Sequence, residues 1–456
     1  MMSIDFDVLI AGAGPAGCCL ARSLAQRGWR VALLERDPAG PAGKPIVIEV
    51  ERAAFFSADV PPPGPDQIIY HPRRIRCFSS RGKQAISLTG NDMPWAIRLD
   101  ALVRLLAQSA AEAGVQIVPG HEVLHPLIKN GRVIGAAVRA GGRTSECHAR
   151  LTVDATGRAA QLTRRLPPEM GISFPGEDER LVTAGCYLHE AEVDELRRAI
   201  ADNTHGDDET WIRLGQYGSY STVFSHASLQ RQLAYILIGY RLGTGQPPIA
   251  NAIRQFEADH GFFGPLLFGG DAVIRINRGL PRLVADAFLT VGEAACQVVP
   301  VTGSGVASAL TAARLAADAA DNALSSNDLS TKALWSYSAR YHRGRGRTLA
   351  AFDVNRLYLD HFPPERVADM LEAGLIGQQD MIDTQMTRPP RFALSSLPQR
   401  IAGFCRQPKL LPPLFRAAML TASVLRHYSK YPAQYDRDLF TTWADQETRL
   451  FTTNSF

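Results

Sequence analysis

A glycine-rich turn between two short apolar runs is the dominant feature of the N-terminal end of the chain. The runs at 8–10 and 31–34 are short enough to be buried strands, and leucines at helical spacing occupy the stretch between them. The turn contains three glycines in the pattern GxGxxG: Gly12, Gly14 and Gly17. Glu35 directly follows the second run. This order predicts a strand, a tight turn, a helix and a second strand, the arrangement of a dinucleotide-binding α/β unit.

Each residue of this motif has a physical role in holding a dinucleotide. Gly12 permits the tight turn, Gly14 removes a side chain where a pyrophosphate must approach the backbone, and Gly17 lets the helix pack closely. Unpaired N–H groups at the helix N-terminus then face the phosphates, and the helix dipole favours their negative charge. Glu35 can accept hydrogen bonds from the ribose hydroxyls of the adenosine.

A second glycine-containing turn lies further along the chain. An apolar run at 288–291 leads into Gly292 and Glu293, followed by a proline and glycine turn and an alanine-rich helix. This order places Glu293 at the carboxyl end of a strand, and Gly303 and Gly305 at the start of a helix. The acid can hold a ribityl hydroxyl, and the helix N-terminus can stabilise the negative charge of a reduced flavin.

Three segments together resemble the fingerprints of the p-hydroxybenzoate hydroxylase superfamily of flavoproteins. They are GAGPAG near the N-terminus, VDATGR at 153–158 and VGEAACQVVPVTGSGVASAL at 291–310. The superfamily includes aromatic and polyketide hydroxylases, flavin-dependent halogenases, geranylgeranyl reductases and, more distantly, lycopene cyclases. The resemblance covers roughly residues 5–325 and implies FAD as the cofactor. The third segment departs from the family in having Glu293 where most members have Asp.

The resemblance also implies a set of FAD-binding residues. They are Gly12, Gly14, Pro15, Ala16, Gly17, Glu35, Arg36, Arg98, Asp154, Gly157, Gly292, Glu293, Pro300, Gly303, Ser304, Gly305 and Val306. In the family, an arginine that precedes a helix reaches the FAD phosphates. Arg98 matches this position, because leucines at helical spacing follow it.

The predicted fold class is α/β, with a Rossmann-like FAD-binding domain of the GR2 type, an inserted, mostly β substrate domain and a C-terminal helical region. The predicted units are 3–60, 94–166 and 275–323 for the FAD-binding domain, 61–93 and 167–274 for the substrate domain, and 334–456 for the helical region. Asn130-Gly131 and Gly141-Gly142 predict the hairpins of a three-stranded meander, and residues 219–240 predict two strands joined by a short turn.

Composition excludes several other classes of protein. A net charge of +4, from 49 basic and 45 acidic residues, does not indicate a nucleic-acid partner. The seven cysteines are scattered without a CxxC pair, and no basic and apolar leader begins the chain, so we expect a reduced, cytoplasmic protein without a metal site. No apolar window reaches the ~18 residues of a membrane-spanning helix, so any membrane contact is expected to be peripheral.

The electron source is not encoded by a second dinucleotide motif. No other GxGxxG follows an apolar run, and the short GTG segment at 243–245 is followed by Pro247-Pro248, where a helix would be needed. NADH or NADPH is therefore expected to dock transiently as the reductant, unless another protein supplies the electrons.

Local signatures distinguish only some of the reactions found in the superfamily. The segment at 218–224, GSYSTVF, lacks both tryptophans of the halogenase signature GWxWxIP. It matches the geranylgeranyl reductase signature PxxYxWxFP only in part, because Ser225 stands in place of the proline.

We expect a single-component FAD-dependent monooxygenase that uses dioxygen to hydroxylate an electron-rich, aromatic substrate through a flavin hydroperoxide. The substrate could be a small molecule, a carrier-bound intermediate or a protein side chain. The alternatives are a geranylgeranyl reductase-like enzyme that reduces an isoprenoid double bond, and a redox-neutral flavoprotein similar to a lycopene cyclase.

Several titratable side chains are candidates for a base on the substrate side of the flavin. His71, His226 and Glu49 are the predicted catalytic residues, and Glu51 lies in the same part of the sequence. Each of them can also be structural. The run HRGRGR at 342–347 could bind an acidic or phosphorylated partner, or form ion pairs on a helix.

Overall fold

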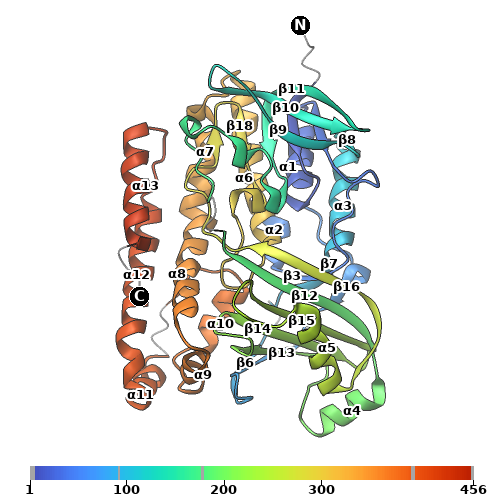
Figure 1. Ribbon diagram of the computed structural model, residues 1–456, viewed down its shortest axis with the longest axis vertical. Helices are drawn as coiled ribbons and strands as arrows, with labels where there is room; N and C mark the ends of the chain where they lie inside the picture. Colours follow the sequence, from blue (N-terminus) through green and yellow to red (C-terminus); the bar gives the residue numbers. More distant parts are fainter. Residues whose placement is uncertain (1–5, 91–92, 176–178, 392–395, 453–456) are drawn as a thin grey trace.

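Figure 1 shows the fold of the chain in a computed structural model, which describes residues 6–90, 93–175, 179–391 and 396–452. One sheet lies in the upper part of this view and a second sheet in the lower part. Long helices from the C-terminal part of the chain run along one side of the molecule and pass both sheets.

The upper sheet contains the parallel strands that the glycine motif predicts, with β17 antiparallel at one edge. Its strands have the order β17-β18-β11-β1-β2-β8. Their bounds are β1 Phe6–Ala11, β2 Val31–Leu34, β8 Gln116–Val118, β11 Arg143–Asp154, β17 Val284–Ala285 and β18 Phe288–Thr290. β1 pairs in parallel with both β2 and β11, and its inner residues are buried, as expected for a strand covered on both faces.

Three helices flank this sheet. They are α1 (Pro15–Ala25), α3 (Leu99–Glu112) and α6 (Val306–Ser325). α1 contacts both α3 and α6, and the alanine-rich sequence of α6 allows this close packing. The helix after the first glycine turn and the helix after the second one therefore lie side by side, with their N-termini at the carboxyl ends of β1 and β18.

The predicted meander is confirmed. β9 (Glu122–Lys129) and β10 (Arg132–Ala140) form an antiparallel hairpin, and β10 pairs in the same way with β11. Asn130, Gly131, Gly141 and Gly142 all have positive φ at the two turns, which is the reason that asparagine and glycine are found there.

The lower sheet is largely antiparallel and has the order β16-β12-β15-β14-β13-β5-β6. The bounds are β5 Arg74–Phe78, β6 Gln84–Thr89, β12 Leu181–Ala191, β13 Glu209–Leu214, β14 Ser221–Ser228, β15 Leu233–Arg241 and β16 Phe263–Arg275. The helices α4 (Val193–Ala201) and α5 (Ile249–His260) cover its outer side. The hairpin of β14 and β15 confirms the two strands predicted within residues 219–240.

A small sheet lies against the large lower one. It has the order β3-β7-β4, with β3 at Val47–Val50, β7 at Trp95–Arg98 and β4 at Ile68–Tyr70, and α2 (Arg52–Ser57) follows β3. Tyr70 of this sheet packs in one buried cluster with Cys186 and Tyr235 of the lower sheet. The small sheet joins β4 from the predicted substrate domain to β3 and β7 from the predicted FAD-binding domain.

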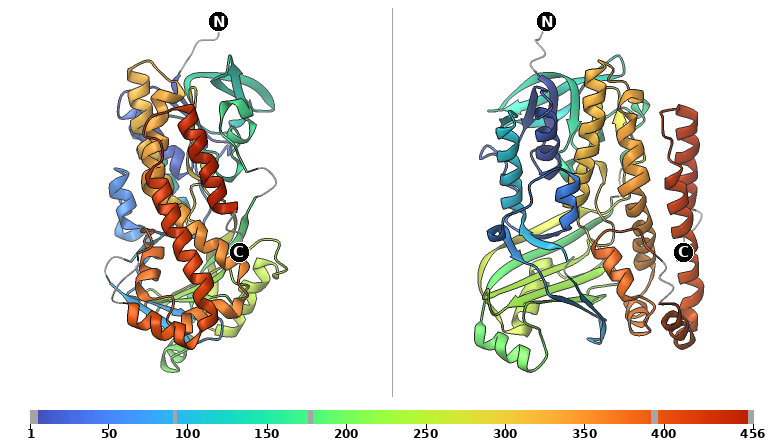
Figure 2. Two further views of the ribbon diagram at one scale, coloured as in Figure 1. Left: turned by 90° about the vertical axis from the view of Figure 1, so that its left-hand side faces the viewer. Right: turned by 180° about the vertical axis from the view of Figure 1, so that it is seen from behind.

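Helices form the rest of the described chain. They are α7 (Thr331–Tyr341), α8 (Arg347–His361), α9 (Pro364–Glu372), α10 (Gln378–Gln385), α11 (Leu397–Arg406), α12 (Leu411–Ser429) and α13 (Arg437–Thr452). A kink at Gly344, within His342–Gly346, joins α7 to α8. Both views of Figure 2 show α12 running along α8 and α13, in agreement with their contacts.

The predicted fold class is confirmed by this arrangement: a Rossmann-like unit, a β-rich insertion and C-terminal helices. Among the described residues, no helix is both long enough and apolar enough to cross a membrane.

Candidate active site between the glycine turn and the C-terminal helices

One large cavity connects the parts of the fold. Its volume is about 1520 Å³, and its walls come from the first glycine turn, the small sheet, the lower sheet, the second glycine turn and helices α8 to α12. Pockets for drug-sized ligands have volumes of ~300–1,000 Å³. The cavity therefore has room for a dinucleotide and a further molecule.

The three glycines of the first turn differ in what surrounds them. Gly12 has φ +100°, and a Cβ there would lie 2.5 Å from the carbonyl oxygen of Ala155, so only glycine fits. A Cβ on Gly17 would collide with the carbonyl oxygen of Gly12, because α1 packs directly against the turn. Gly14 lines the cavity, and a Cβ there would have no protein atom within 4 Å. The backbone at Gly14 therefore borders open space in the cavity, and this open space is called the cradle below.

Glu35 lies at the cavity wall, at the end of β2. Its Oε2 accepts a hydrogen bond from the backbone N–H of Ala13 at 3.1 Å, and its Oε1 accepts one from Asp37 at 3.0 Å. Each carboxylate oxygen can accept a second hydrogen bond. The side chain is thus fixed beside the turn with acceptor capacity directed to a ligand, and the neighbouring Arg36 also lines the cavity.

Glu293 lies at the wall formed by the second turn. Its Oε1 accepts a hydrogen bond from the backbone N–H of Arg275 at 2.9 Å. Burial raises the pKa of Glu293, although Arg275 acts in the opposite direction. Arg275 is itself fully buried and bonds the carbonyl of Glu293 and the carboxylate of Glu179. It is a positioning residue that sequence reasoning missed.

The start of α6 lies beside Glu293. Gly305 is the N-cap of α6, so the N–H groups of its first turn lack partners within the helix. Gly303, Ser304, Gly305 and Val306 all line the cavity. This places the positive end of a helix dipole against the cavity, where it favours a negatively charged ligand ring.

Most of the predicted FAD-binding residues are brought together at this cavity. Those that line it are Gly12, Gly14, Pro15, Ala16, Glu35, Arg36, Gly157, Gly292, Glu293, Gly303, Ser304, Gly305 and Val306. The free cradle at Gly14, the two acidic acceptors and the two helix N-termini have the shape and chemistry that FAD requires.

The other predicted FAD-binding residues are not part of the cavity lining. Gly17 packs α1 against the turn, and Asp154 accepts hydrogen bonds from the backbone N–H groups of Thr156 and Thr163, so it holds its own loop. Arg98 makes a bidentate ion pair with Asp100, at 2.7 and 3.0 Å.

Pro300 contributes through its carbonyl oxygen, which accepts a hydrogen bond from the Tyr220 hydroxyl. Tyr220 lies on the loop before β14 and lines the cavity. This bond ties the lower sheet to the second glycine turn.

Of the three predicted catalytic residues, only Glu49 lines the cavity. It projects from β3 and accepts a hydrogen bond from the Tyr70 hydroxyl at 3.2 Å. Burial raises the pKa of Glu49 to about 7, so near neutral pH this carboxyl can both hold and release a proton.

His226 and His71 lie away from the cavity lining. His226 is on the same face of β14 as Thr222 and Phe224, which line the cavity, but the ring of Tyr70 stacks on it at 3.8 Å between centroids. Burial lowers the pKa of His226 well below the usual value, so its ring is neutral. The His71 ring bonds the carbonyl of Met93 at 3.1 Å, outside the cavity. His226 is thus covered by a stacked ring and His71 is bonded to the backbone, whereas Glu49 lies at the cavity wall.

Arginines of the HRGRGR run bind other residues of the same chain. Arg345 makes an ion pair with Glu51 at 3.0 Å and also bonds Ser308 near the start of α6. Glu51 accepts a further hydrogen bond from Thr387, and both Glu51 and Thr387 line the cavity. Arg343 bonds the carbonyl of Tyr431. The run therefore fastens the C-terminal helices to the FAD-binding part.

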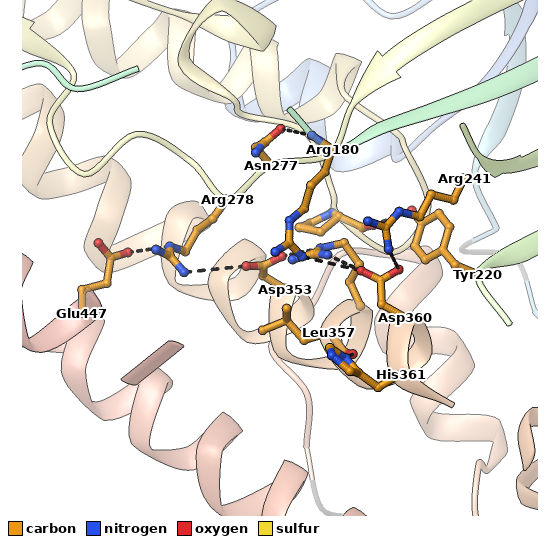
Figure 3. A network of polar contacts seen from close by, with 12 residues as sticks. Arg180, Tyr220, Arg241, Asn277, Arg278, Asp353, Leu357, Asp360, His361 and Glu447 are labelled. Carbon is orange, nitrogen blue, oxygen red and sulfur yellow. Dashed lines mark hydrogen bonds and ion pairs between the residues drawn. The ribbon is translucent and has the colours of Figure 1, made fainter. Parts of the chain in front are cut away.

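A buried polar network holds α8 in place (Figure 3). Asp360 of α8 pairs with Arg241 at the end of β15 at 3.1 Å and with Arg180 before β12 at 3.6 Å. Arg278 bridges Asp353 of α8, at 3.9 Å, and Glu447 of α13, at 3.0 Å. The carboxylates of Asp353, Asp360 and Glu447 are buried, and a buried charge is stable only when it is paired. The network therefore holds α8 against the lower sheet.

The C-terminal helices complete the cavity, which sequence reasoning did not foresee. Apolar side chains from α8 to α12 form this wall: Leu359, Phe362, Met370, Met381, Phe404 and Leu414. Their helical spacing could have indicated a buried face, but only the packed structure shows that the face encloses a cavity.

Comparisons with known proteins also indicate an FAD-binding fold. Residues 7–165 match the family described as FAD dependent oxidoreductase. The chain is 23% identical to the digeranylgeranylglycerophospholipid reductase of Sulfolobus acidocaldarius over 95% of this chain and 94% of that one. It is 27% identical to the enzyme of the same name from Methanoculleus marisnigri over 76% of this chain and 84% of that one.

Solved structures with this fold include a geranylgeranyl bacteriochlorophyll reductase-like protein from Thermoplasma acidophilum. It has a TM-score of 0.73 and 19% identity, and the match covers 90% of this chain and 99% of that one. A myxobacterial chondrochloren halogenase has a TM-score of 0.58 and 18% identity, with 88% and 97% coverage.

The prediction that the main reaction is hydroxylation of an aromatic substrate is wrong. The two curated relatives named above, which match 95% and 76% of the chain, are reductases, and the reductase-like structure has a higher TM-score than the halogenase. The match to the family, the cradle at Gly14 and the acids at the cavity wall agree on the cofactor. The chain is an FAD-dependent oxidoreductase, with a Rossmann-like FAD-binding unit, a β-rich insertion and C-terminal helices.

Proposed function

We propose that the chain is a flavin-dependent reductase that saturates carbon–carbon double bonds in the isoprenoid chains of a lipid. The observation that supports this most is the continuity of the cavity, which runs from the second glycine turn to the C-terminal helices with largely apolar walls. The names of the relatives from Sulfolobus acidocaldarius and Methanoculleus marisnigri point to the same substrate class.

The shape of the wall suits a long apolar chain more than a compact aromatic ring. Phe224 and Leu237 of the lower sheet line the cavity, and so do Leu359 of α8 and Phe362 directly after it. Such walls exclude water and bind by burial of apolar area. A phenol or indole would leave much of this volume unfilled, whereas an isoprenoid chain can extend through it.

Saturation of a double bond adds a hydride to one carbon and a proton to the other. When bound, FAD supplies the hydride after a reductant has given it two electrons. Glu49 is the proton donor of the proposal, because it lies at the wall and burial raises its pKa to about 7. Tyr70 orients the carboxyl through its hydroxyl hydrogen bond. No dioxygen is consumed.

NADH or NADPH is the transient reductant in this proposal, as the lack of a second GxGxxG motif suggests. The three predicted units then share one reaction: the FAD-binding domain holds the cofactor, and the substrate domain and the helical region enclose the isoprenoid chain.

The test is an anaerobic assay. The FAD-loaded protein is reduced chemically and mixed with a geranylgeranyl ether lipid in detergent, and the lipid is analysed by mass spectrometry. The expected product has gained two hydrogens for each double bond that was reduced, and the flavin is reoxidised. A lipid that stays unchanged, or a product that forms only with oxygen and contains an added oxygen atom, would overturn the proposal.

A further inference from the structure

Exposed apolar side chains follow one stripe on each of two adjacent helices. They are Leu397 and Ile401 on α11, and Leu411, Phe415 and Met419 on α12, with 39%, 55%, 47%, 62% and 55% of their surface exposed. The spacing of four residues places them on one side of each helix. In the described part of the chain, five of the eleven large exposed apolar side chains belong to this set. Clustered exposure of this kind marks an interaction surface.

This surface, called here the docking face, lies on a segment of the chain that carries only positive charge. Residues 396–430 contain no Asp or Glu, although the whole chain has 45 of them in 456 residues. The same segment has six basic residues: Arg400, Arg406, Lys409, Arg416, Arg426 and Lys430. All except Arg400, which pairs with Asp380, are exposed. The docking face therefore combines exposed apolar side chains with exposed basic ones and has no acidic side chain of its own.

The cavity opens through the docking face. Leu397, Ile401, Leu411 and Phe415 line the cavity and are at the same time well exposed. A ligand that enters between α11 and the first turns of α12 can therefore pass directly between the C-terminal helices toward the glycine turns. Figure 2 shows α11 and this end of α12 together at one extremity of the molecule, away from the N-terminus.

We propose that the docking face binds the surface of an anionic lipid bilayer, so that the mouth of the cavity opens into the membrane. Apolar side chains enter the interface, and the basic residues contact the lipid phosphates. This proposal rests on the proposed function, because it takes the substrate to be a lipid. It adds the place from which that lipid reaches the enzyme. A membrane-bound isoprenoid chain could then enter the cavity without crossing water.

The charge of the docking face argues against a second copy of the chain as its occupant. A two-fold contact would bring the basic residues of both copies together, and like charges at an interface are unfavourable. An anionic bilayer has the complementary charge over the whole area, and it also supplies molecules that match the cavity.

The test is co-sedimentation of the FAD-loaded, full-length protein with vesicles. The vesicles contain either phosphatidylcholine alone or equal parts of phosphatidylcholine and phosphatidylglycerol, and neither contains an isoprenoid lipid. We expect binding to the anionic vesicles that weakens as salt is added. No binding to anionic vesicles at low salt would overturn the proposal.

Two variants and a matched control locate the contact. Arg406→Glu combined with Lys409→Glu should weaken binding by at least about 25-fold, since each basic residue near an anionic surface contributes about fivefold. Phe415→Ser should also weaken binding, whereas Phe56→Ser on α2, where the side chain is 66% exposed, should not. Unchanged binding in both docking-face variants would overturn the proposal, as would a wild-type dimer that Phe415→Ser converts to a monomer in light scattering.

The two proposals fail in different ways. Reductase activity in detergent without vesicle binding overturns only the docking face. Vesicle binding that depends on Phe415 and the basic residues, without any reduction of an isoprenoid lipid, overturns only the proposed reaction.

Discussion

Tyr70 donates its hydroxyl hydrogen bond to Oε1 of Glu49 at 3.2 Å, and on its other side its ring stacks on His226. Tyr70 thus contacts both Glu49 and His226, two of the three residues that the sequence predicts to be catalytic. It leaves the carboxyl at the cavity wall and covers the imidazole. The hydrogen bond also lowers the pKa of Glu49, against the larger effect of burial, which raises that pKa to about 7.

The first prediction concerns this pair. If Glu49 delivers the proton, Glu49→Gln should lower the rate of double-bond reduction by about 10²–10⁴-fold, the usual contribution of a general acid. Reduction of the flavin by dithionite should be unchanged. In the wild type, the rate should fall as the pH rises through about 7, because the carboxyl then loses its proton.

Tyr70→Phe provides the control for this assignment. Removing the hydroxyl removes a hydrogen bond that favours the carboxylate, so the descending limb of the pH profile should move to higher pH. A pH profile that is the same in wild type, Tyr70→Phe and Glu49→Gln would exclude Glu49 as the proton donor.

The second prediction separates two glycines of the same motif. In Gly14→Val, the new side chain meets no protein atom near its Cβ and enters the cavity, so the protein should fold but contain no FAD. In Gly17→Ala, the methyl group collides with the carbonyl of Gly12, so the thermal midpoint of unfolding should fall. Flavin absorbance of the purified variants, together with circular dichroism on heating, measures both effects. FAD retained in folded Gly14→Val would show that the cradle is not the pyrophosphate site.

The third prediction tests the ion pair between Arg345 and Glu51. Their side chains are only 15% and 9% exposed, so Arg345→Met leaves a nearly buried carboxylate without its counter-charge. The free energy of unfolding should fall by about 3 kcal/mol. Combining Arg345→Met with Glu51→Gln should recover part of that loss, as measured by urea denaturation. If the double variant is no more stable than Arg345→Met alone, the pair is not coupled.

The fourth prediction tests the path of the substrate. Ala418 of α12 lines the cavity and is exposed, so Ala418→Trp should block the cavity without disturbing the core. Reduction of geranylgeranyl lipid should fall, with a higher KM, while FAD content stays the same. Ala402→Trp is the matched control, because Ala402 is exposed on α11 and does not line the cavity. Equal activity of the two variants would place the substrate elsewhere.

Motifs within a short stretch of sequence were sufficient to predict the cofactor end of the molecule. The turn from Gly12 to Gly17, the end of β2 at Glu35 and the start of α6 at Gly305 form from residues close together in the chain. Local backbone geometry and helix termini specify each of these features. The hairpins at Asn130-Gly131 and Gly141-Gly142 were predictable for the same reason.

The substrate end depended on contacts between distant segments. The ring of Tyr70, from another sheet, covers His226. Arg345 forms an ion pair with Glu51, which is far away in the sequence. The sequence could propose these residues but not their neighbours, which is also why the hydroxylase reaction was preferred over reduction of a long apolar chain.

The sequence by itself thus determined the nucleotide-binding unit, the order of the strands around the two glycine turns and the choice of FAD. The tertiary structure alone decided which titratable group faces the ligand, and how far the cavity extends. Its apolar wall lies where the buried carboxylates of Asp353 and Asp360 pair with Arg278 and Arg241, and residues of α8 to α12 line it. A motif acts through neighbouring backbone, whereas a cavity is the space left between elements, and that space is set by how their faces pack.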